Sequence, residues 1–271
     1  EGDEGGGDLE FIVDALRSNP KSAVLQEHAV AALRDIAVNS ETRIRARELG
    51  MLRLVVDALR MHPTRAGLVR VCCEALRNLS AGDGDNKRVL GELDACALVS
   101  AGITRHLGND LLQVSAAGAL WNLSAGNNSN KERCGDGAVG ALITTLRAHV
   151  RSSAVIEAVL GALASILPGL VPKMGGSASP PGRVLPVIAA MRIHLNNATL
   201  QLRALATILS FCKLDPDERQ VMEDSGGRDL VLMTIDSHHS HEHIHDLAQR
   251  LLVVLQEGGQ AKRSPVKRLL R

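Results

Sequence analysis

The sequence predicts an all-α fold in which about six similar helical units stack into a solenoid. The first observation is composition: hydrophobic residues make up 45% of the 271 residues, but aromatic residues make up only 1%. A core of Leu, Val, Ile and Ala suits packed helices, whereas a β-sandwich needs aromatic and β-branched strands. The second and third observations are two columns of residues that recur along the chain at a common spacing.

The first column is a short apolar motif. Its copies begin 42 to 44 residues apart. Self-similarity at a fixed period of this length is the signature of stacked helical repeats. The copies read ALRDIA from Ala32, ALRNLS from Ala75, ALWNLS from Ala119, ALASIL from Ala162, ALATIL from Ala204 and, more weakly, DLAQRL from Asp246.

The second column keeps the same spacing and therefore fixes the register of the repeats. Its members lie 43 to 45 residues apart, and an Arg stands two places before four of them. A His at the end of a helix can hydrogen-bond the last carbonyl groups of that helix, and we expect this role here. The column consists of Asn19, His62, His106, His149, His194 and His238, and the four Arg residues are Arg17, Arg60, Arg147 and Arg192.

Each unit reads as a short, a medium and a longer helix. Residues 55–62 have the pattern of a helix that Pro63 ends, because proline cannot continue a helix. Residues 67–80 carry apolar side chains at steps of three and four residues, as one buried stripe requires. The polar stretches that open later units predict very short, capped helices. These stretches are 85–93, 129–136 and 217–225.

Two copies of the motif, at 75–80 and 119–124, read A-L-x-N-L-S. This pattern and the unit length resemble the armadillo repeat. The resemblance covers about residues 8–257 and implies an all-α, right-handed superhelical solenoid of about six armadillo-type repeats. HEAT repeats are the nearest alternative, but they usually have two helices per unit. The predicted units lie near 8–40, 41–84, 85–128, 129–170, 181–216 and 217–257.

Three segments fall outside the regular pattern. Residues 1–7 are acidic and Gly-rich, so we expect a disordered start and a first unit that lacks its first helix. Residues 168–186 hold five of the nine prolines, which predicts a Pro/Gly loop in place of one short helix. This loop is either a surface insertion or a hinge or docking element. Residues 258–271 form a basic tail, interpreted as a solvated end, a localisation signal or a phosphorylation site at Ser264.

The resemblance also implies a binding face. In armadillo proteins the third helices line a concave face that binds extended peptides, and the Asn of the motif hydrogen-bonds the peptide backbone. An amide side chain carries both a donor and an acceptor, so a column of amides can match an extended backbone. The alternative is that the column holds neighbouring loops. The column at this position reads Asp35, Asn78, Asn122, Ser165, Thr207 and Gln249.

Charged and aromatic residues beside this column complete the predicted site. Arg34 and Arg77 are expected to pair with acidic side chains of a partner, and Trp121 to anchor an apolar one. The alternatives are core packing for Trp121 and a solvated charge for Arg77. Glu74 and Gly118 stand where importin-type receptors carry Trp, which argues against recognition of classical nuclear localisation signals. The partner-binding candidates are Arg34, Asp35, Glu74, Arg77, Asn78, Trp121 and Asn122.

Composition and motifs argue against several other functions. The net charge of +1 and the scarcity of aromatic residues disfavour nucleic-acid binding, and no apolar run reaches the length of a membrane span. The sequence has no GxSxG or P-loop motif, and we predict no catalytic residue and no cofactor. Residues 238–245 are the one local cluster that suggests a metal, but because His238 belongs to the repeating column we predict no metal site.

The predicted function is that of a non-catalytic, monomeric scaffold that binds an extended segment of another protein along its concave face. Five cysteines without a CxxC pair indicate buried thiols and an intracellular setting, cytoplasmic or nuclear. A second hypothesis is that the array is the targeting module of a larger enzyme, such as a ligase or a kinase. A third hypothesis is a His-based metal binder.

Overall fold

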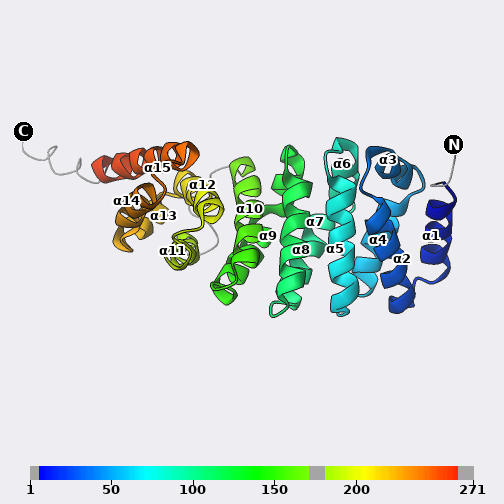
Figure 1. Cartoon of the computed structure of the whole chain (residues 1–271). Coiled ribbons are helices and arrows are strands. Elements are labelled where there is room, and N and C mark those ends of the chain that lie inside the picture. The colour runs from blue at the N-terminus through cyan, green and yellow to red at the C-terminus, as the bar shows by residue number, and fades with distance from the viewer. Residues whose placement is uncertain (1–5, 171–180, 262–271) are drawn as a thin grey trace, which may run out of the picture.

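The computed structural model describes residues 6–170 and 181–261. These ranges contain fifteen α-helices, one short 3-10 helix and no strand, so the predicted all-α fold is confirmed. The helices stand side by side in a row from α1 to α15, which gives the chain the form of a helical solenoid (Figure 1). Within the described ranges, no helix combines the length and the apolar character that crossing a membrane requires.

The first three units contain the helices α1 to α8. The first unit has two helices, α1 (Gly6–Ser18) and α2 (Ala23–Ile36). The second and third units each have a short, a medium and a long helix. These are α3 (Ser40–Glu48), α4 (Met51–Met61) and α5 (Ala66–Ser80), followed by α6 (Gly84–Glu92), α7 (Ala95–Arg105) and α8 (Asp110–Ser124).

The later units are less regular. In the fourth unit the first two helices join as α9 across a kink at Gly135, whose φ of 48° is readily adopted only by glycine. The fifth unit has two helices, and the last unit has three. The elements are α9 (Asn128–Ala148), α10 (Ser153–Ile166), the 3-10 helix η1 (Leu167–Gly169), α11 (Val184–Ile193), α12 (Ala198–Leu214), α13 (Pro216–Asp224), α14 (Gly227–Ser237) and α15 (Glu242–Ala261).

Three boundaries differ from those predicted. α1 begins at Gly6, so the last two residues of the expected disordered start are helical. α11 begins at Val184, so Pro186 lies in a first helical turn and not in the loop; a missing N–H there costs no hydrogen bond. α15 continues to Ala261, past the predicted start of the tail. The predictions for residues 1–5, 171–180 and 262–271, which include Ser264, lie outside the described residues.

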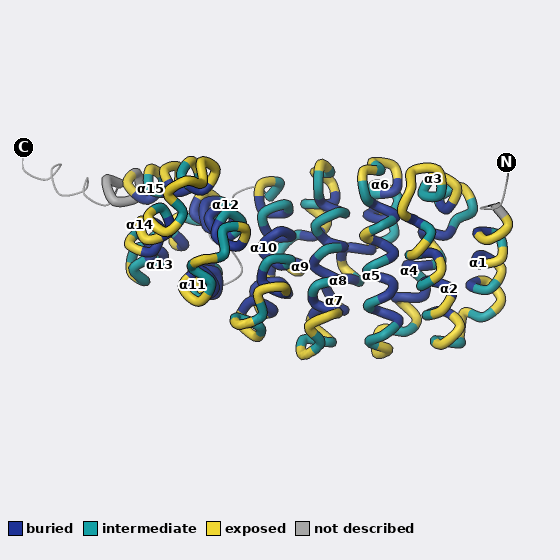
Figure 2. The backbone as a smooth tube through the Cα atoms, viewed as in Figure 1, coloured by how far each residue is buried: buried dark blue, intermediate teal, exposed yellow. Residues whose placement is uncertain are grey.

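The third helices of successive units form one continuous layer. α2, α5, α8, α10, α12 and α15 each contact the next helix in this order. Figure 2 shows that buried positions run through the inside of the array. Leu76 and Leu120, which share a place in the motif, are 0% exposed, and burial of a Leu side chain stabilises a fold by about 1.5–3 kcal/mol. The motif therefore recurs because each unit needs the same apolar side chains against its neighbours.

The His column joins neighbouring units. The backbone N–H of each His ends its own helix, as His62 does on the carbonyl of Ala58. The ring Nε2 instead donates to a carbonyl oxygen of the preceding unit, at 2.5 to 3.0 Å. The expectation that the side chains bond their own helix ends is therefore wrong. The pairs are His62 with Pro20, His106 with Pro63, His149 with Leu107, His194 with Val150 and His238 with Leu195.

Buried amides form two further columns that we did not predict from the sequence. Gln26, Gln113 and Gln201 each donate to two carbonyl groups at the end of the second helix of their own unit. Asn86 and Asn130 each donate to a carbonyl of the preceding short helix and to another at the end of the preceding third helix. Each amide satisfies carbonyl groups that a helix end leaves without partners. The units are thus joined by polar contacts as well as by apolar ones.

A carboxylate of the last unit binds residues 182–184, where the chain enters α11. Glu218 on α13 is completely buried. Its Oε1 accepts the backbone N–H groups of Gly182 and Arg183, and its Oε2 accepts that of Val184. The side chain of Arg183 donates to the same carboxylate at 3.0 Å and to Asp215 at 3.0 Å. Glu218 therefore caps the beginning of α11, and no helix precedes α11 in residues 181–183.

All five cysteines are buried and unpaired. Burial raises the pKa of the Cys73 thiol from 9.0 to about 12, and the charge of Glu74 adds to this effect. The thiol consequently ionises in the unfolded chain near pH 9 but stays protonated in the folded chain. The stability that this thiol contributes is complete below pH 9 and is lost as the pH rises from 9 toward 12.

We predict that this linkage appears as an alkaline loss of stability. Between pH 8 and pH 10 the unfolding free energy should fall by about 1.4 kcal/mol through Cys73 alone, because the unfolded state releases a proton that the folded state keeps. Urea denaturation of the wild type and of Cys73→Ala at both pH values measures the difference. An equal alkaline loss in the two proteins would contradict the prediction.

Candidate partner-binding face on the third helices

The predicted binding residues come from three consecutive third helices. Arg34 and Asp35 lie near the end of α2, Glu74, Arg77 and Asn78 on α5, and Trp121 and Asn122 on α8. Hydrogen bonds and ion pairs between the helices bring these residues together. We call the surface that they form, with the matching positions of α10 and α12, the third-helix face.

Asn78 and Asn122 make the same contact in successive units. Nδ2 of Asn78 donates to the carbonyl oxygen of Arg34 at 2.9 Å, and Nδ2 of Asn122 donates to that of Arg77 at 2.9 Å. Both side chains are half-buried, and no other hydrogen bond to either amide is present in the described part of the chain. The two residues therefore lie on the same side of the solenoid. Their amides bond the neighbouring third helix and not a loop.

The polar column does not continue unchanged along the array. Ser165 accepts a hydrogen bond from Ser124 at 2.8 Å, and Gln249 is exposed. Thr207 is completely buried and donates to the carbonyl of Arg203 at 2.8 Å. Thr207 therefore does not reach the surface, because a hydroxyl on the buried side of a helix is satisfied by the carbonyl four residues earlier.

A charged cluster joins the first three units on this face. Arg34 donates to Asp35 at 2.7 Å and to Oε2 of Glu74 at 2.8 Å. Arg70 and Ser115 donate to Oε1 of Glu74, at 2.6 and 3.0 Å. Burial would raise the pKa of the Glu74 carboxyl, but the bonds from Arg34 and Ser115 and the charge of Arg70 hold it below its usual value. Both oxygens of Glu74 and the guanidinium of Arg34 are therefore already engaged.

A regular diagonal contact explains where Arg77 and Trp121 lie. In each of the first three units the residue before the column contacts the residue four places before the column in the next unit. A Cβ at Gly118 would lie 3.1 Å from Cδ of Arg77, and a Cβ at Gly161 would lie 2.7 Å from Cε3 and Cζ3 of Trp121. The Arg34–Glu74 ion pair occupies the same diagonal one unit earlier. Glycine at these two positions thus gives the larger side chain its place.

Arg203 of α12 contacts the third-helix face, and sequence analysis did not single it out. Its guanidinium carbon lies 4.7 Å from the ring centroid of Trp121, and it donates to the carbonyl of Glu157 at 2.7 Å. Trp121 is half-buried between this guanidinium and Gly161, and its role as an anchor for a partner stays a prediction. Arg203 stands four residues before Thr207 of the column. The importin-type pattern has Trp at this place, so the sequence analysis considered only whether a Trp was present there.

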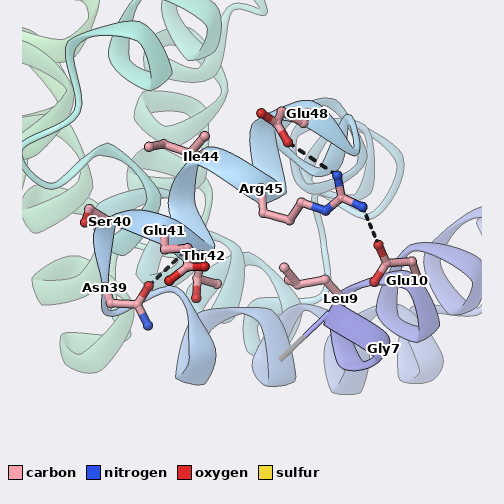
Figure 3. Close-up of a pocket in the computed structure, with 10 residues that line it drawn as sticks. All are labelled: Gly7, Leu9, Glu10, Asn39, Ser40, Glu41, Thr42, Ile44, Arg45 and Glu48. Carbon is pink, nitrogen blue, oxygen red and sulfur yellow. Dashed lines mark hydrogen bonds and ion pairs between the residues drawn. The ribbon is translucent and has the colours of Figure 1, made fainter. Parts of the chain in front are cut away.

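Other hollows of the molecule lie away from this face. A hollow of 960 Å³ lies between α1 and α3. Arg45, which lines it, pairs with both Glu10 and Glu48 (Figure 3). No group of three or more His, Cys, Asp or Glu side chains that could hold a metal is present in residues 6–170 and 181–261. The His-rich segment of residues 238–245 lies within these residues.

The fold resembles those of solved armadillo structures. A designed armadillo repeat protein in complex with the peptide (KR)4 aligns over 91% of this chain and 99% of its own, with a TM-score of 0.68 and 18% identity. An engineered protein aligns over 93% and 97%, with a TM-score of 0.68 and 18% identity. A third solved structure has the description "a conserved phosphorylation switch controls the interaction between cadherin and β-catenin". It aligns over 95% of this chain, with a TM-score of 0.76 and 18% identity.

This chain spans about half the length of the last of these structures, 50% of that chain being covered. No family model matches the sequence, and no curated protein matches it. The likeness in structure, together with the repeating helices and the two copies of the A-L-x-N-L-S motif, identifies the architecture. The chain has an armadillo-type repeat fold.

Proposed function

We propose that the chain is a non-catalytic scaffold that binds an extended segment of a partner protein along the third-helix face. The observation that carries the proposal is the matched placement of Asn78 and Asn122. Each amide uses one N–H within the array and retains a second N–H and the carbonyl oxygen. An extended backbone presents N–H and C=O groups at regular intervals, which such amides can meet.

The comparisons support a binding role by analogy. A designed armadillo repeat protein of this fold has been solved in complex with a peptide, and another structure of this fold concerns the interaction between cadherin and β-catenin. A solenoid can offer a long binding surface because each unit contacts only its neighbours and leaves one side free. We propose that the chain acts as a monomer, in the cytoplasm or the nucleus.

The experiment is affinity capture of partners with the wild type and with an Asn78→Ala/Asn122→Ala variant. We expect the variant to lose partners that the wild type recovers, since two backbone-binding amides are removed. The matched control is Asn128→Ala/Asn196→Ala, which removes two exposed amides outside the third-helix face. Circular dichroism of each variant verifies its helical content. Equal recovery of every partner by the two variants would refute the proposed binding face.

A further inference from the structure

We infer that the third-helix face recognises an acidic segment, through a carboxylate of the partner that pairs with Arg77. This inference rests on the proposed function and names the chemical class of the partner: an extended segment that carries Asp or Glu at the junction of the second and third units. Three observations support the inference: the distribution of ion pairs on the face, the hydrogen-bond donors around Arg77 that have no acceptor, and the exposure of the Arg77 side chain.

Among the charged residues of the third-helix face in the first two units, all but one form an ion pair. Arg34 lies against Asp35 and Glu74, and Arg70 lies against Glu74. Glu74 is the acidic residue nearest to Arg77 on α5, but Arg34, Arg70 and Ser115 occupy both of its oxygens. Arg77 forms no ion pair and no side-chain hydrogen bond with any residue that the structure describes. A guanidinium without a carboxylate therefore remains at this junction.

The position of Arg77 suits a ligand. The residue is exposed, and its side chain extends across Gly118 of the next unit, where a larger residue would crowd its Cδ. Its own carbonyl oxygen accepts the hydrogen bond from Asn122. The amide of Asn122 is thus held at the backbone of Arg77, and Asn122 stands one helical turn after Gly118, across which the side chain of Arg77 extends. A partner residue could place its carboxylate on Arg77, as a bidentate pair, while its backbone meets Asn122.

The neighbouring unit adds donors and no competing carboxylate. The indole N–H of Trp121 has no acceptor among the described residues, and the charge of Arg203 lies over its ring. The third unit contributes Gly118, Trp121 and Asn122 to the face, none of which is acidic. Unpartnered donors favour a ligand rich in acceptors, whereas a Lys or Arg side chain at this junction would meet the like charge of Arg77.

The test is selection from a random peptide display library on the immobilised protein. We expect the enriched peptides to share an Asp or Glu at one position. Arg77→Gln should weaken their binding by about tenfold or more, because a charge-assisted bidentate pair is lost. The matched control is Arg88→Gln, which removes an exposed guanidinium of α6 whose ion pair, within the described part of the chain, is with Glu92. Its affinity for the peptides should equal that of the wild type.

Charge reversal makes the test independent of the stability of any one variant. Arg77→Glu should reject the acidic peptides and bind versions in which Lys replaces the shared acid. Peptides that bind, and that lose binding with Asn78→Ala/Asn122→Ala but not with Arg77→Gln, would overturn this inference and leave the proposed function standing. Enrichment of Lys- and Arg-rich peptides would overturn it as well. Failure to enrich any peptide would count against the proposed function too.

Discussion

Glu218→Ala is expected to lower the unfolding free energy of the chain by about 3 kcal/mol, because it removes a buried charge partner and leaves donors without acceptors. The carboxylate is 0% exposed and accepts from three successive backbone N–H groups and from Arg183. Without it, the first turn of α11 loses its cap. Among the described residues, the guanidinium of Arg183, 13% exposed, then keeps only Asp215 and the ring of Phe211, 5.1 Å away.

Urea denaturation followed by circular dichroism measures this loss. Glu92→Ala is the matched control, since Glu92 also forms an ion pair with an Arg but is 50% exposed. Exposed pairs of this kind are worth about 0.3–0.5 kcal/mol, so the control should change little. A loss below about 1 kcal/mol in Glu218→Ala, within the range of an ordinary hydrogen bond, would show that Glu218 does not hold the start of α11.

Gly161→Val is expected to destabilise the chain by about 3 kcal/mol and to move Trp121, since overpacking of a close contact costs this much. A Cβ at residue 161 would lie 2.7 Å from two ring carbons of Trp121. The ring cannot retreat freely, because the guanidinium of Arg203 lies on it. Displacement of the ring would break this stack and expose apolar surface between α8 and α10.

The fluorescence of Trp121 reports the change directly, because the chain has one Trp and no Tyr. We expect a red-shifted emission in Gly161→Val together with the lower unfolding free energy. Gly140→Ala is the matched control: Gly140 also lies in a helix, but a Cβ added there would meet no side chain of the described residues within 4 Å. That variant should gain up to about 1 kcal/mol from helix propensity. Unchanged emission and stability in Gly161→Val would contradict the diagonal contact.

The order and type of the helices could be predicted from the sequence because the repeats impose two spacings. Leu76 and Leu120 hold equivalent places in successive units, and both are buried. The apolar pattern therefore repeats along the chain. Pro63 follows α4 closely, as the helix-ending rule requires. By contrast, Glu218 stands at the place that Asn86 and Asn130 hold in their units, three residues after the N-cap of the short helix, but it is a carboxylate and accepts where those amides donate. The backbone groups that it accepts are 34 to 36 residues away, and the spacing of the repeats does not reveal this change of role.

The binding candidates illustrate a second limit. Arg34 and Arg77 occupy equivalent places in the motif, but only the structure distinguishes them, because Glu74 faces Arg34 whereas Gly118 faces Arg77. The distinction depends on the residue four places before the column in the next unit. Arg203 contacts Trp121 across two units, so this diagonal does not predict that contact. Thr207 shows the converse, since its polar side chain is satisfied inside the helix.

The most direct test of the proposed binding face is to observe the side-chain amides of Asn78 and Asn122 while a peptide binds. In protein labelled with ¹⁵N at asparagine, a peptide from the selection should shift both amide resonances and leave those of Asn128 and Asn196 in place. That result would mean that a guest backbone meets the paired amides. Saturating binding by calorimetry with both resonances of Asn78 and Asn122 unmoved would contradict the account, because the guest would then lie elsewhere on the solenoid.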